Sequence, residues 1–223
     1  MTPHQAVPGT QGYAEEAEEI IPRYETIPFE AHHAPEMHLL PTQPGRVLDI
    51  GAGTGVDAAW FADRGHTVVA VEPTDAFRQA AQALHPSPSI EWLNDALPHL
   101  DQVIARQARF DLIMLSGVWM HLDKDERQEA MPRLTQLLTP NGILVLSLRH
   151  WPVPPGRRMF EVSGQETVAL AQVHGLGPVL HVQTESIQAG NRASGVTWTR
   201  LAFRCSLQGA CLSPDRQARQ HHQ

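Results

Sequence analysis

The sequence of 223 residues contains only two cysteines, no long apolar run and no cluster of basic residues. Cys205 and Cys211 do not have the C-x-x-C spacing of a metal or redox site, so the simplest interpretation is a reduced protein. No apolar stretch approaches the ~20 residues that a membrane span needs. Residues 1–12 also lack the charged and apolar segments of a signal peptide. We therefore expect a cytoplasmic protein with no membrane partner.

Basic side chains are too few for a protein that holds nucleic acid by charge. The sequence has 17 basic against 24 acidic residues, a formal net charge of -7. Binding to the phosphate backbone requires the opposite balance, so we expect no nucleic-acid partner. Hydrophobic residues make up 42% of the chain and charged residues 18%, which is typical of a folded globular protein. The length suits one domain.

A glycine-rich turn is the main motif of the chain. The apolar run 47–50 predicts a strand, and the residues after Gly55 have a helical pattern, from about residue 56 to 64. Glycines at 51, 53 and 55 allow a sharp turn and let a ligand lie against bare main chain. The following helix directs free N–H groups toward that ligand. The spacing G-x-G-x-G differs from the dinucleotide fingerprint G-x-G-x-x-G.

Further strands and helices alternate after this turn, as expected of a parallel α/β sheet. Two of the predicted strands end in acidic residues. Glu72-Pro73 follows the second strand, where a carboxylate can accept hydrogen bonds from two ribose hydroxyls; the alternative is a solvated surface glutamate. Asp95-Ala96 follows the third, where a carboxylate can accept from an adenine amino group; the alternative is a turn-forming aspartate. The strands are predicted at 67–71, 89–93, 110–115 and 143–148, and the helices at 74–84 and 124–138.

Three phrases resemble class I S-adenosylmethionine-dependent methyltransferases. Asp49 to Gly55 reads D-x-G-x-G-x-G, as in motif I of that family. Phe110 to Ser116 resembles its motif IV. Residues 137–145 resemble its L-x-P-G-G-x-L passage, with Asn141 where glycine is common; asparagine tolerates positive φ, so the departure is mild. The resemblance covers about residues 44–206.

The resemblance implies an α/β fold, a Rossmann-like three-layer sandwich. Its seven-stranded sheet is mostly parallel with a reversed last strand, and N-terminal helices form a lid. It also implies S-adenosyl-L-methionine as the cofactor, with its methionine part over the glycine turn, its ribose at Glu72 and its adenine near Asp95. The cofactor-binding residues expected on this basis are Asp49, Gly51, Ala52, Gly53, Gly55, Glu72, Pro73, Asp95, Ala96 and Ser116.

The two ends of the chain are predicted to be flexible tails, at 1–12 and 207–223, around a single domain at 13–206. Within it, helices at 13–24 and 29–40 belong to the lid, 13–43, and the Rossmann-like core covers 44–206. His32, His33 and His38 lie in the second helix, but their spacing suits no metal site, so we expect no metal.

The region after residue 148 departs from the α/β pattern. Residues 149–158 are rich in proline and arginine and predict a long surface loop. A helix is expected at 164–174. Segments 180–187 and 196–205 alternate apolar and polar residues and predict an antiparallel pair joined by a turn around Gly190 and Asn191.

The candidate catalytic residues follow strands four and five. His121 is the first candidate for a general base, and His150 the second; His121 could instead cap the next helix or pack in the core. Trp119 could form a wall of the substrate site or pack in the core. Arg149, with Arg157 and Arg158, could bind an acidic group of the substrate or form a solvated loop.

The predicted activity is methyl transfer to an O, N or C atom of a small molecule by in-line displacement. The main alternative is a non-catalytic module on the same fold that binds the cofactor or a partner. An NAD(P)-dependent oxidoreductase is less favoured, because the third glycine is missing and the predicted edge hairpin is antiparallel. Methylation of nucleic-acid bases is disfavoured by the charge and by Ser116-Gly117-Val118-Trp119 after strand four.

Overall fold

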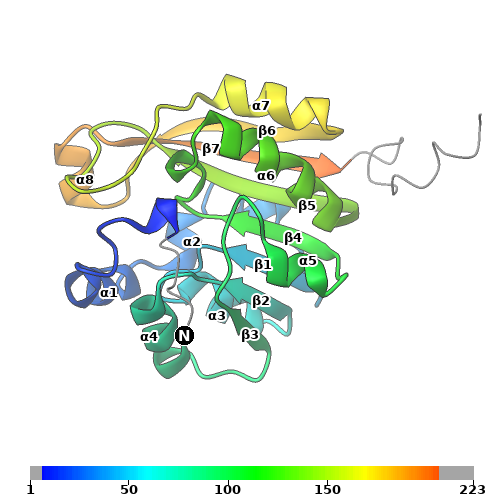
Figure 1. Ribbon diagram of the computed structural model, residues 1–223, viewed down its shortest axis with the longest axis horizontal. Coiled ribbons are helices and arrows are strands. Elements are labelled where there is room, and N and C mark those ends of the chain that lie inside the picture. The colour runs from blue at the N-terminus through cyan, green and yellow to red at the C-terminus, as the bar shows by residue number, and fades with distance from the viewer. Residues whose placement is uncertain (1–6, 206–223) are drawn as a thin grey trace, which may run out of the picture.

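A seven-stranded sheet runs through the computed structural model, which describes residues 7–205 (Figure 1). The strands lie in the order β3-β2-β1-β4-β5-β7-β6. Their bounds are β1 Arg46–Ile50, β2 Thr67–Val71, β3 Ile90–Leu93, β4 Phe110–Leu115, β5 Leu138–Arg149, β6 Leu176–Glu185 and β7 Thr197–Cys205.

The strand directions decide which residues meet at the carboxyl ends of the parallel strands. All pairs among β1 to β5 are parallel, whereas β7 is antiparallel to both β5 and β6. The predicted seven-stranded sheet with a reversed last strand is confirmed. Because β7 runs the opposite way, its first residues lie at the edge where β1, β2, β4 and β5 end (Figure 1).

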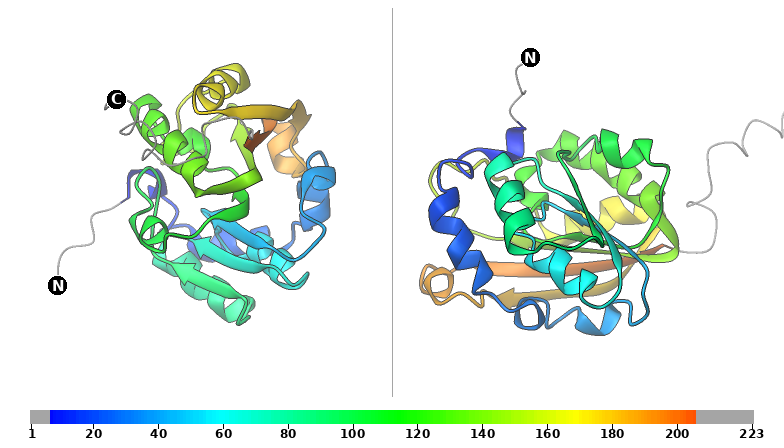
Figure 2. Two further views of the ribbon diagram at one scale, coloured as in Figure 1. Left: turned by 90° about the vertical axis from the view of Figure 1, so that its right-hand side faces the viewer. Right: turned by 90° about the horizontal axis from the view of Figure 1, so that it is seen from below.

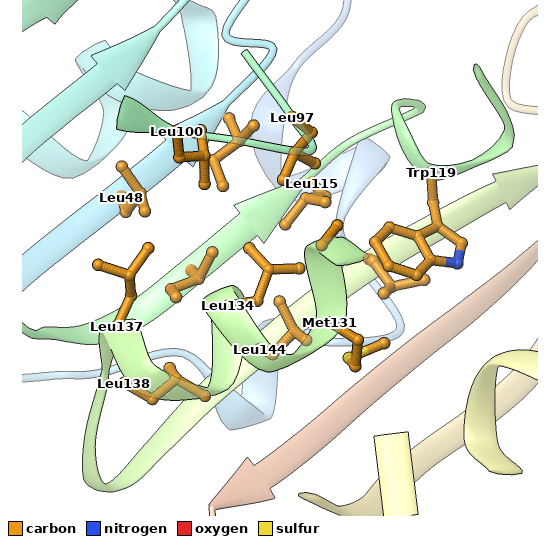
Figure 3. Packing of buried hydrophobic residues seen from close by; sticks show 14 of the residues in the cluster. Leu48, Leu97, Leu100, Leu115, Trp119, Met131, Leu134, Leu137, Leu138 and Leu144 are labelled. Atoms are coloured by element: carbon orange, nitrogen blue, oxygen red, sulfur yellow. The ribbon is translucent and has the colours of Figure 1, made fainter. Parts of the chain in front are cut away.

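The sheet is covered on both faces, which gives the three layers that the sequence predicts. Successive side chains of a strand point to opposite faces. Leu48 and Val69 belong to the core cluster formed with α5 (Asp101–Ala105), α6 (Lys124–Leu137) and α7 (Gly164–Val173), part of which is shown in Figure 3. Val47 and Val68 belong to the cluster formed with α2 (Phe29–His32) and α3 (Val56–Ala62). Burial on both faces explains the nearly continuous apolar runs of these strands.

Helix α6 begins at a capping box that also fixes the segment before it. The Asp123 carboxylate accepts a hydrogen bond from the N–H of Glu126 (2.9 Å), and the Glu126 carboxylate accepts one from the N–H of Asp123 (2.7 Å). This arrangement satisfies two N–H groups that the helix leaves free. It also holds the short 3-10 helix η3 (Trp119–His121), two residues upstream, at the end of β4.

The N-terminal part differs from the prediction in two places. Residues 7–12, expected to be part of a tail, contain the 3-10 helix η1 (Pro8–Thr10), while residues 1–6 lie outside the described part. The helix expected at 29–40 is wrong, because Pro35 has no N–H to continue it; α2 and a 3-10 helix η2 (Met37–Leu39) replace it. Helix α1 (Ala17–Glu25) continues through Pro22 and packs against α4 (Asp75–Leu84) (Figures 1 and 2).

The C-terminal hairpin also has one difference from the prediction. The antiparallel pair is present, but helix α8 (Ala189–Ala193) joins its strands in place of a tight turn.

Asn141 adopts a φ of 66°, the positive value that its position at the turn before β5 predicts. Cys205 is disulfide-bonded, so the expectation that this residue is reduced is wrong. The tail expected at 207–223 lies outside the described residues, and the division into a 13–43 lid and a 44–206 core stays a prediction. Within residues 7–205, no helix has both the length and the hydropathy of a membrane span.

Candidate functional site

A cavity of about 740 Å³ lies at the edge of the sheet where the parallel strands end. Its walls come from the turn after β1, the ends of β2, β4 and β5, the start of β7 and the N-terminal segment. Ligands of open α/β sheets bind at this edge, where the strand order reverses. The volume lies within the range of about 300–1,000 Å³ that is usual for cofactor and small-molecule sites.

The glycine turn presents bare main chain to this cavity. A Cβ added at Gly53 would have no heavy atom within 4 Å, and the residue has a φ of 55°. Gly51 is needed for another reason, because an added Cβ would lie 2.5 Å from Cγ2 of Val118. Gly55 does not line the cavity, and an added Cβ would meet the Trp92 ring at 2.8 Å. Gly55 shapes the turn and precedes α3, and its predicted contact with the cofactor stays a prediction.

Asp49 provides an unpaired carboxylate oxygen beside this turn. The residue is 1% exposed and lines the cavity, and its Oδ2 has no hydrogen-bond partner among the described residues. Burial raises the pKa of Asp49 well above its usual range, and the carboxylate of Asp57 raises it further. A buried oxygen without a partner is costly, so the arrangement suits a ligand that brings a donor, above all a cationic one.

Glu72 holds the glycine turn in place. Its two carboxylate oxygens accept hydrogen bonds from the N–H groups of Gly53 (2.9 Å) and Thr74 (2.7 Å). Burial raises the pKa of Glu72, and these two hydrogen bonds act in the opposite direction. Each oxygen keeps a further lone pair, so the carboxylate can also accept from a ligand hydroxyl. Glu72 and the adjacent Pro73 both line the cavity.

Asp95 and Ala96 also line the cavity, but the Asp95 carboxylate already has backbone partners. It accepts hydrogen bonds from the N–H of Ala96 (2.9 Å) and from those of Gln102 (2.7 Å) and Val103 (3.0 Å) in the first turn of α5. These bonds match the turn-forming alternative for this residue. The predicted contact with adenine stays a prediction.

A buried ionic network lies beneath the cavity. His33 is 0% exposed, and its two ring nitrogens contact the carboxylates of Glu36 (2.8 Å) and Asp57 (2.9 Å). Burial alone would lower the pKa of His33, but these carboxylates raise this pKa to about 9. The Ser116 hydroxyl donates to the same Asp57 oxygen (3.1 Å), and Arg200 lies 3.5 Å from Glu36. The network therefore joins the N-terminal helices to α3, the end of β4 and β7.

His121 lies on the other side of the cavity and is paired with a tyrosine. Its Nδ1 is 2.7 Å from the carbonyl oxygen of Arg158, so Nδ1 carries the proton and donates it. Its Nε2 then accepts a hydrogen bond from the Tyr13 hydroxyl at 3.1 Å. Burial lowers the pKa of His121, which favours a neutral ring, and burial raises the pKa of Tyr13. The cavity thus contains a neutral imidazole whose basic nitrogen faces another cavity-lining side chain.

Two of the predicted site residues lie elsewhere. Trp119 is 0% exposed and packs in the core near Met131, so its predicted role as a wall of the substrate site is wrong (Figure 3). His150 does not line the cavity, and its Nε2 pairs with the Thr199 hydroxyl at 2.7 Å, so its place does not support the role of a second base, which stays a prediction. Arg149 does line the cavity, together with a tryptophan from β7, Trp198.

Several cavity residues could not be identified from the sequence. Tyr13 and Tyr24 lie in a segment whose contacts with the core depend on the folded arrangement. Trp198 lies in a strand whose alternation predicts only that it belongs to a hairpin. Asp57 is different, because it follows the glycine turn by two residues, and an acidic residue in the first turn of α3 could have been identified. Among residues 7–205, no group of three side chains is placed to bind a metal ion.

Comparison with known proteins identifies the domain. A family model described as a methyltransferase domain matches residues 47–142. Among relatives, an uncharacterized methyltransferase of Staphylococcus carnosus (strain TM300) is 32% identical over 108 residues, 48% of this chain and 49% of that protein. Glycine N-methyltransferase of Oryctolagus cuniculus is 24% identical over 193 residues, 76% of this chain and 65% of that protein. This chain thus spans about half the length of the first relative and under two thirds of the second.

A solved structure shows the same fold over nearly the whole described chain. The 1,6-didemethyltoxoflavin-N1-methyltransferase of Burkholderia thailandensis, with bound 1,6-didemethyltoxoflavin and S-adenosylhomocysteine, has a TM-score of 0.64 and 22% identity. The likeness covers 92% of this chain and 93% of that one. The strand order agrees with this likeness in fold. Residues 47–142 carry a methyltransferase domain.

Only some of the residues that line the cavity lie in the part matched by the methyltransferase family. Residues 47–142 contain the glycine turn, Asp49, Glu72, Asp95 and His121. Tyr13, Arg149 and Trp198 lie outside the matched part. The family match therefore covers the glycine turn, the acidic residues and His121, and it does not cover the N-terminal segment, the loop after β5 or β7.

Proposed function

We propose that this protein transfers a methyl group from S-adenosyl-L-methionine to an O or N atom of a small molecule inside the cavity. The observation that carries the proposal is the unpaired, buried Oδ2 of Asp49 beside the open main chain of Gly53. A carboxylate there matches the ammonium group of the cofactor's methionine part. The names of two similar proteins, a glycine N-methyltransferase and a didemethyltoxoflavin N1-methyltransferase, support a small acceptor. A cytoplasmic location stays a prediction.

The residues present fit the cofactor along the carboxyl ends of β1 to β3. Asp49 would accept from its ammonium group, the main chain at Gly51 to Gly53 would lie against its methionine part, and Glu72 would accept from its ribose. Pro73, Ala96 and Ser116 would complete that wall. When bound, the cofactor supplies a methyl group already activated as a sulfonium. The protein then has to orient the acceptor in line and exclude water.

His121 is the group placed to remove a proton from the acceptor. Its Nδ1 proton is fixed by the Arg158 carbonyl, and burial lowers the pKa of the ring, which favours the neutral form whose Nε2 can take a proton. The Tyr13 hydroxyl donates a hydrogen bond to Nε2 and thereby orients the ring. An acceptor whose proton is removed would bind where this hydroxyl lies. His121 thus acts as the general base, and Tyr13 positions it.

Binding of S-adenosylhomocysteine, measured by isothermal titration, tests the cofactor site. Asp49→Asn keeps the shape of the side chain and removes its charge. We expect it to weaken binding about tenfold or more, because a hydrogen bond to a charged group contributes about 1.5–3 kcal/mol. Asp63→Asn is the matched control, since Asp63 is exposed at the end of α3 and does not line the cavity. Absence of binding to the unchanged protein would remove the basis of the proposal.

Methyl transfer itself separates an enzyme from a non-catalytic binding module. In a screen of small acceptors with radiolabelled cofactor, we expect turnover that His121→Asn lowers about 10²–10⁴-fold. Binding of S-adenosylhomocysteine to this variant should be unchanged, because the cofactor residues lie across the cavity. Binding without any turnover would favour the module. The oxidoreductase alternative is opposed by the antiparallel β7, and NADH serves as its control ligand.

A further inference from the structure

Charge is divided unevenly between the two sides of the cavity. The carboxylates of Asp49, Asp57, Glu72 and Asp95 all lie on the side formed by β1 to β3 and α3. The opposite side, formed by the N-terminal segment, the loop after β5 and the start of α6, carries four arginines and two carboxylates, those of Glu16 and Glu126. The arginines that line it are Arg23, Arg149, Arg157 and Arg158.

Two of these four arginines already have carboxylate partners. Arg157 pairs with Glu16 at 2.8 Å, and its guanidinium lies over the Tyr13 ring at 4.1 Å. Arg158 pairs with Glu126 (2.8 Å) and Asp123 (3.1 Å) at the start of α6. These pairs fix the loop and leave little capacity for a ligand.

Arg149 differs, because no carboxylate pairs with it among residues 7–205. Its guanidinium donates to the carbonyl oxygen of Pro152, which uses only part of its five N–H donors. The residue is half-buried at the end of β5, and burial lowers the pKa of its guanidinium. A half-buried cation without a counter-ion is electrostatically unfavourable, so this group suits a ligand that brings one negative charge. Arg23 also lacks a carboxylate partner in this part of the chain, but it is exposed at the cavity mouth.

An aromatic surface lies directly beside Arg149. Arg149 and Trp198 are opposite each other in the register of β5 and β7, so their side chains lie on the same face of the sheet. Both line the cavity, and Trp198 is half-buried there. Trp198 also packs near Gly117, where an added Cβ would be 3.6 Å from its ring, close to the end of β4. A flat ligand on the Trp198 ring would therefore place an acidic substituent within reach of Arg149.

From this pairing we infer that the methyl acceptor is a planar small molecule bearing a carboxylate, with the carboxylate on Arg149 and the ring against Trp198. The inference rests on the proposed function, because it takes the arginine side of the cavity as the acceptor site. A carboxylate is the anion that matches a single half-buried guanidinium in charge, and the two can form paired hydrogen bonds. Trp198 supplies the apolar contact that orients the plane of the acceptor.

Benzoate and benzamide test this inference, since they share a shape and differ in charge. Their binding to the protein is measured by ligand-observed NMR titration, with and without saturating S-adenosylhomocysteine. We expect benzoate to bind about tenfold or more tightly than benzamide, as expected of a hydrogen-bonded charge pair. Arg149→Gln should abolish this preference, and Arg149→Lys should restore part of it. Arg64→Gln, an exposed arginine paired with Glu30 away from the cavity, is the matched control.

The outcomes separate this inference from the proposed function. Equal affinity for benzoate and benzamide, or a preference that survives Arg149→Gln, would overturn the carboxylate site. Loss of the preference in Arg149→Gln, with binding of S-adenosylhomocysteine intact, supports it. If the unchanged protein prefers benzoate but does not bind S-adenosylhomocysteine, the anion site stands and the proposed methyl transfer fails. Trp198→Leu should weaken the binding of benzoate and of benzamide by the same factor. Unequal weakening would contradict the placement of the ligand ring against Trp198.

Discussion

Removal of the imidazole of His33 is the strongest test of the buried network. His33→Gln keeps a polar side chain of similar length but removes the positive charge between Glu36 and Asp57. The pKa of this imidazole is raised from 6.5 to about 9, a shift of 9 − 6.5. At about 1.4 kcal/mol for each pH unit, this corresponds to about 3 kcal/mol of stability. That figure agrees with the roughly 3–5 kcal/mol lost when one partner of a buried ion pair is removed.

Thermal unfolding at several pH values is the assay. A chain of this size loses about 2–4 °C in Tm for each kcal/mol, so His33→Gln should lower Tm by roughly 6–12 °C near pH 6. The contribution of His33 is complete below its unfolded pKa of 6.5 and is lost as pH rises through about 9, because the folded state then no longer binds the extra proton. Asp57 remains ionised over this window, since His33 holds the pKa of Asp57 near 2 despite its burial.

Two other ionisable side chains lie beside the network of His33, and a control variant must leave them unchanged. Arg200 and His32 also face this network, and burial lowers the pKa of His32 to about 4, so His32 does not titrate in the window. His38→Gln, at an exposed position in η2, should leave Tm nearly unchanged at every pH. If His33→Gln lowered Tm no more than His38→Gln, or by the same amount at pH 6 and pH 9.5, the buried imidazolium would be refuted.

Four more predictions concern the proposed cofactor side of the cavity and the core. Gly51→Ala should destabilise the fold by about 1–3 kcal/mol in a denaturant titration, because the new Cβ would meet Val118 at 2.5 Å in a left-handed backbone. Gly53→Ala should cost less stability, since its Cβ meets nothing, yet weaken S-adenosylhomocysteine binding in a titration by projecting into the cavity. Affinity for S-adenosylhomocysteine should rise as pH rises through the elevated pKa of Asp49, and Asp49→Asn should remove this rise. Trp119→Ala should lower the free energy of unfolding by about 3–5 kcal/mol without changing benzoate binding, because the side chain packs in the core.

The sequence predicts the sheet well because its signals are local. The apolar runs of β1, β2 and β4, the glycine turn and the Asp123 cap each depend on residues that are close in the chain. The acids Glu72 and Asp95 could be placed for the same reason, since a strand end is read from the strand itself. Trp119 was ambiguous, because a tryptophan just after a strand can face either the core or the site, and only the packing of η3 against β5 decides it.

The side of the cavity proposed for the acceptor was harder to predict because it is made from contacts between distant segments. Tyr13 and His121 are 108 residues apart, and no periodicity or spacing connects them. The same holds for Arg149 and Trp198, whose proximity follows from the register of β5 and β7. The charge balance of the whole chain was misleading in this respect. A net charge of -7 conceals a cavity wall on which arginines outnumber carboxylates.

Two segments remote in sequence, the N-terminal segment and the loop after β5, contact His121, the proposed general base. The carbonyl of Arg158 fixes the tautomer of His121, and Tyr13 occupies its basic nitrogen. Arg157, next to Arg158, stacks on the ring of Tyr13 and pairs with Glu16. The loop after β5 and the N-terminal segment are thus held to each other as well as to the base. A change in either segment that alters the proposed acceptor site would also move His121, the proposed base, so acceptor specificity and catalytic rate should change together in variants of this loop.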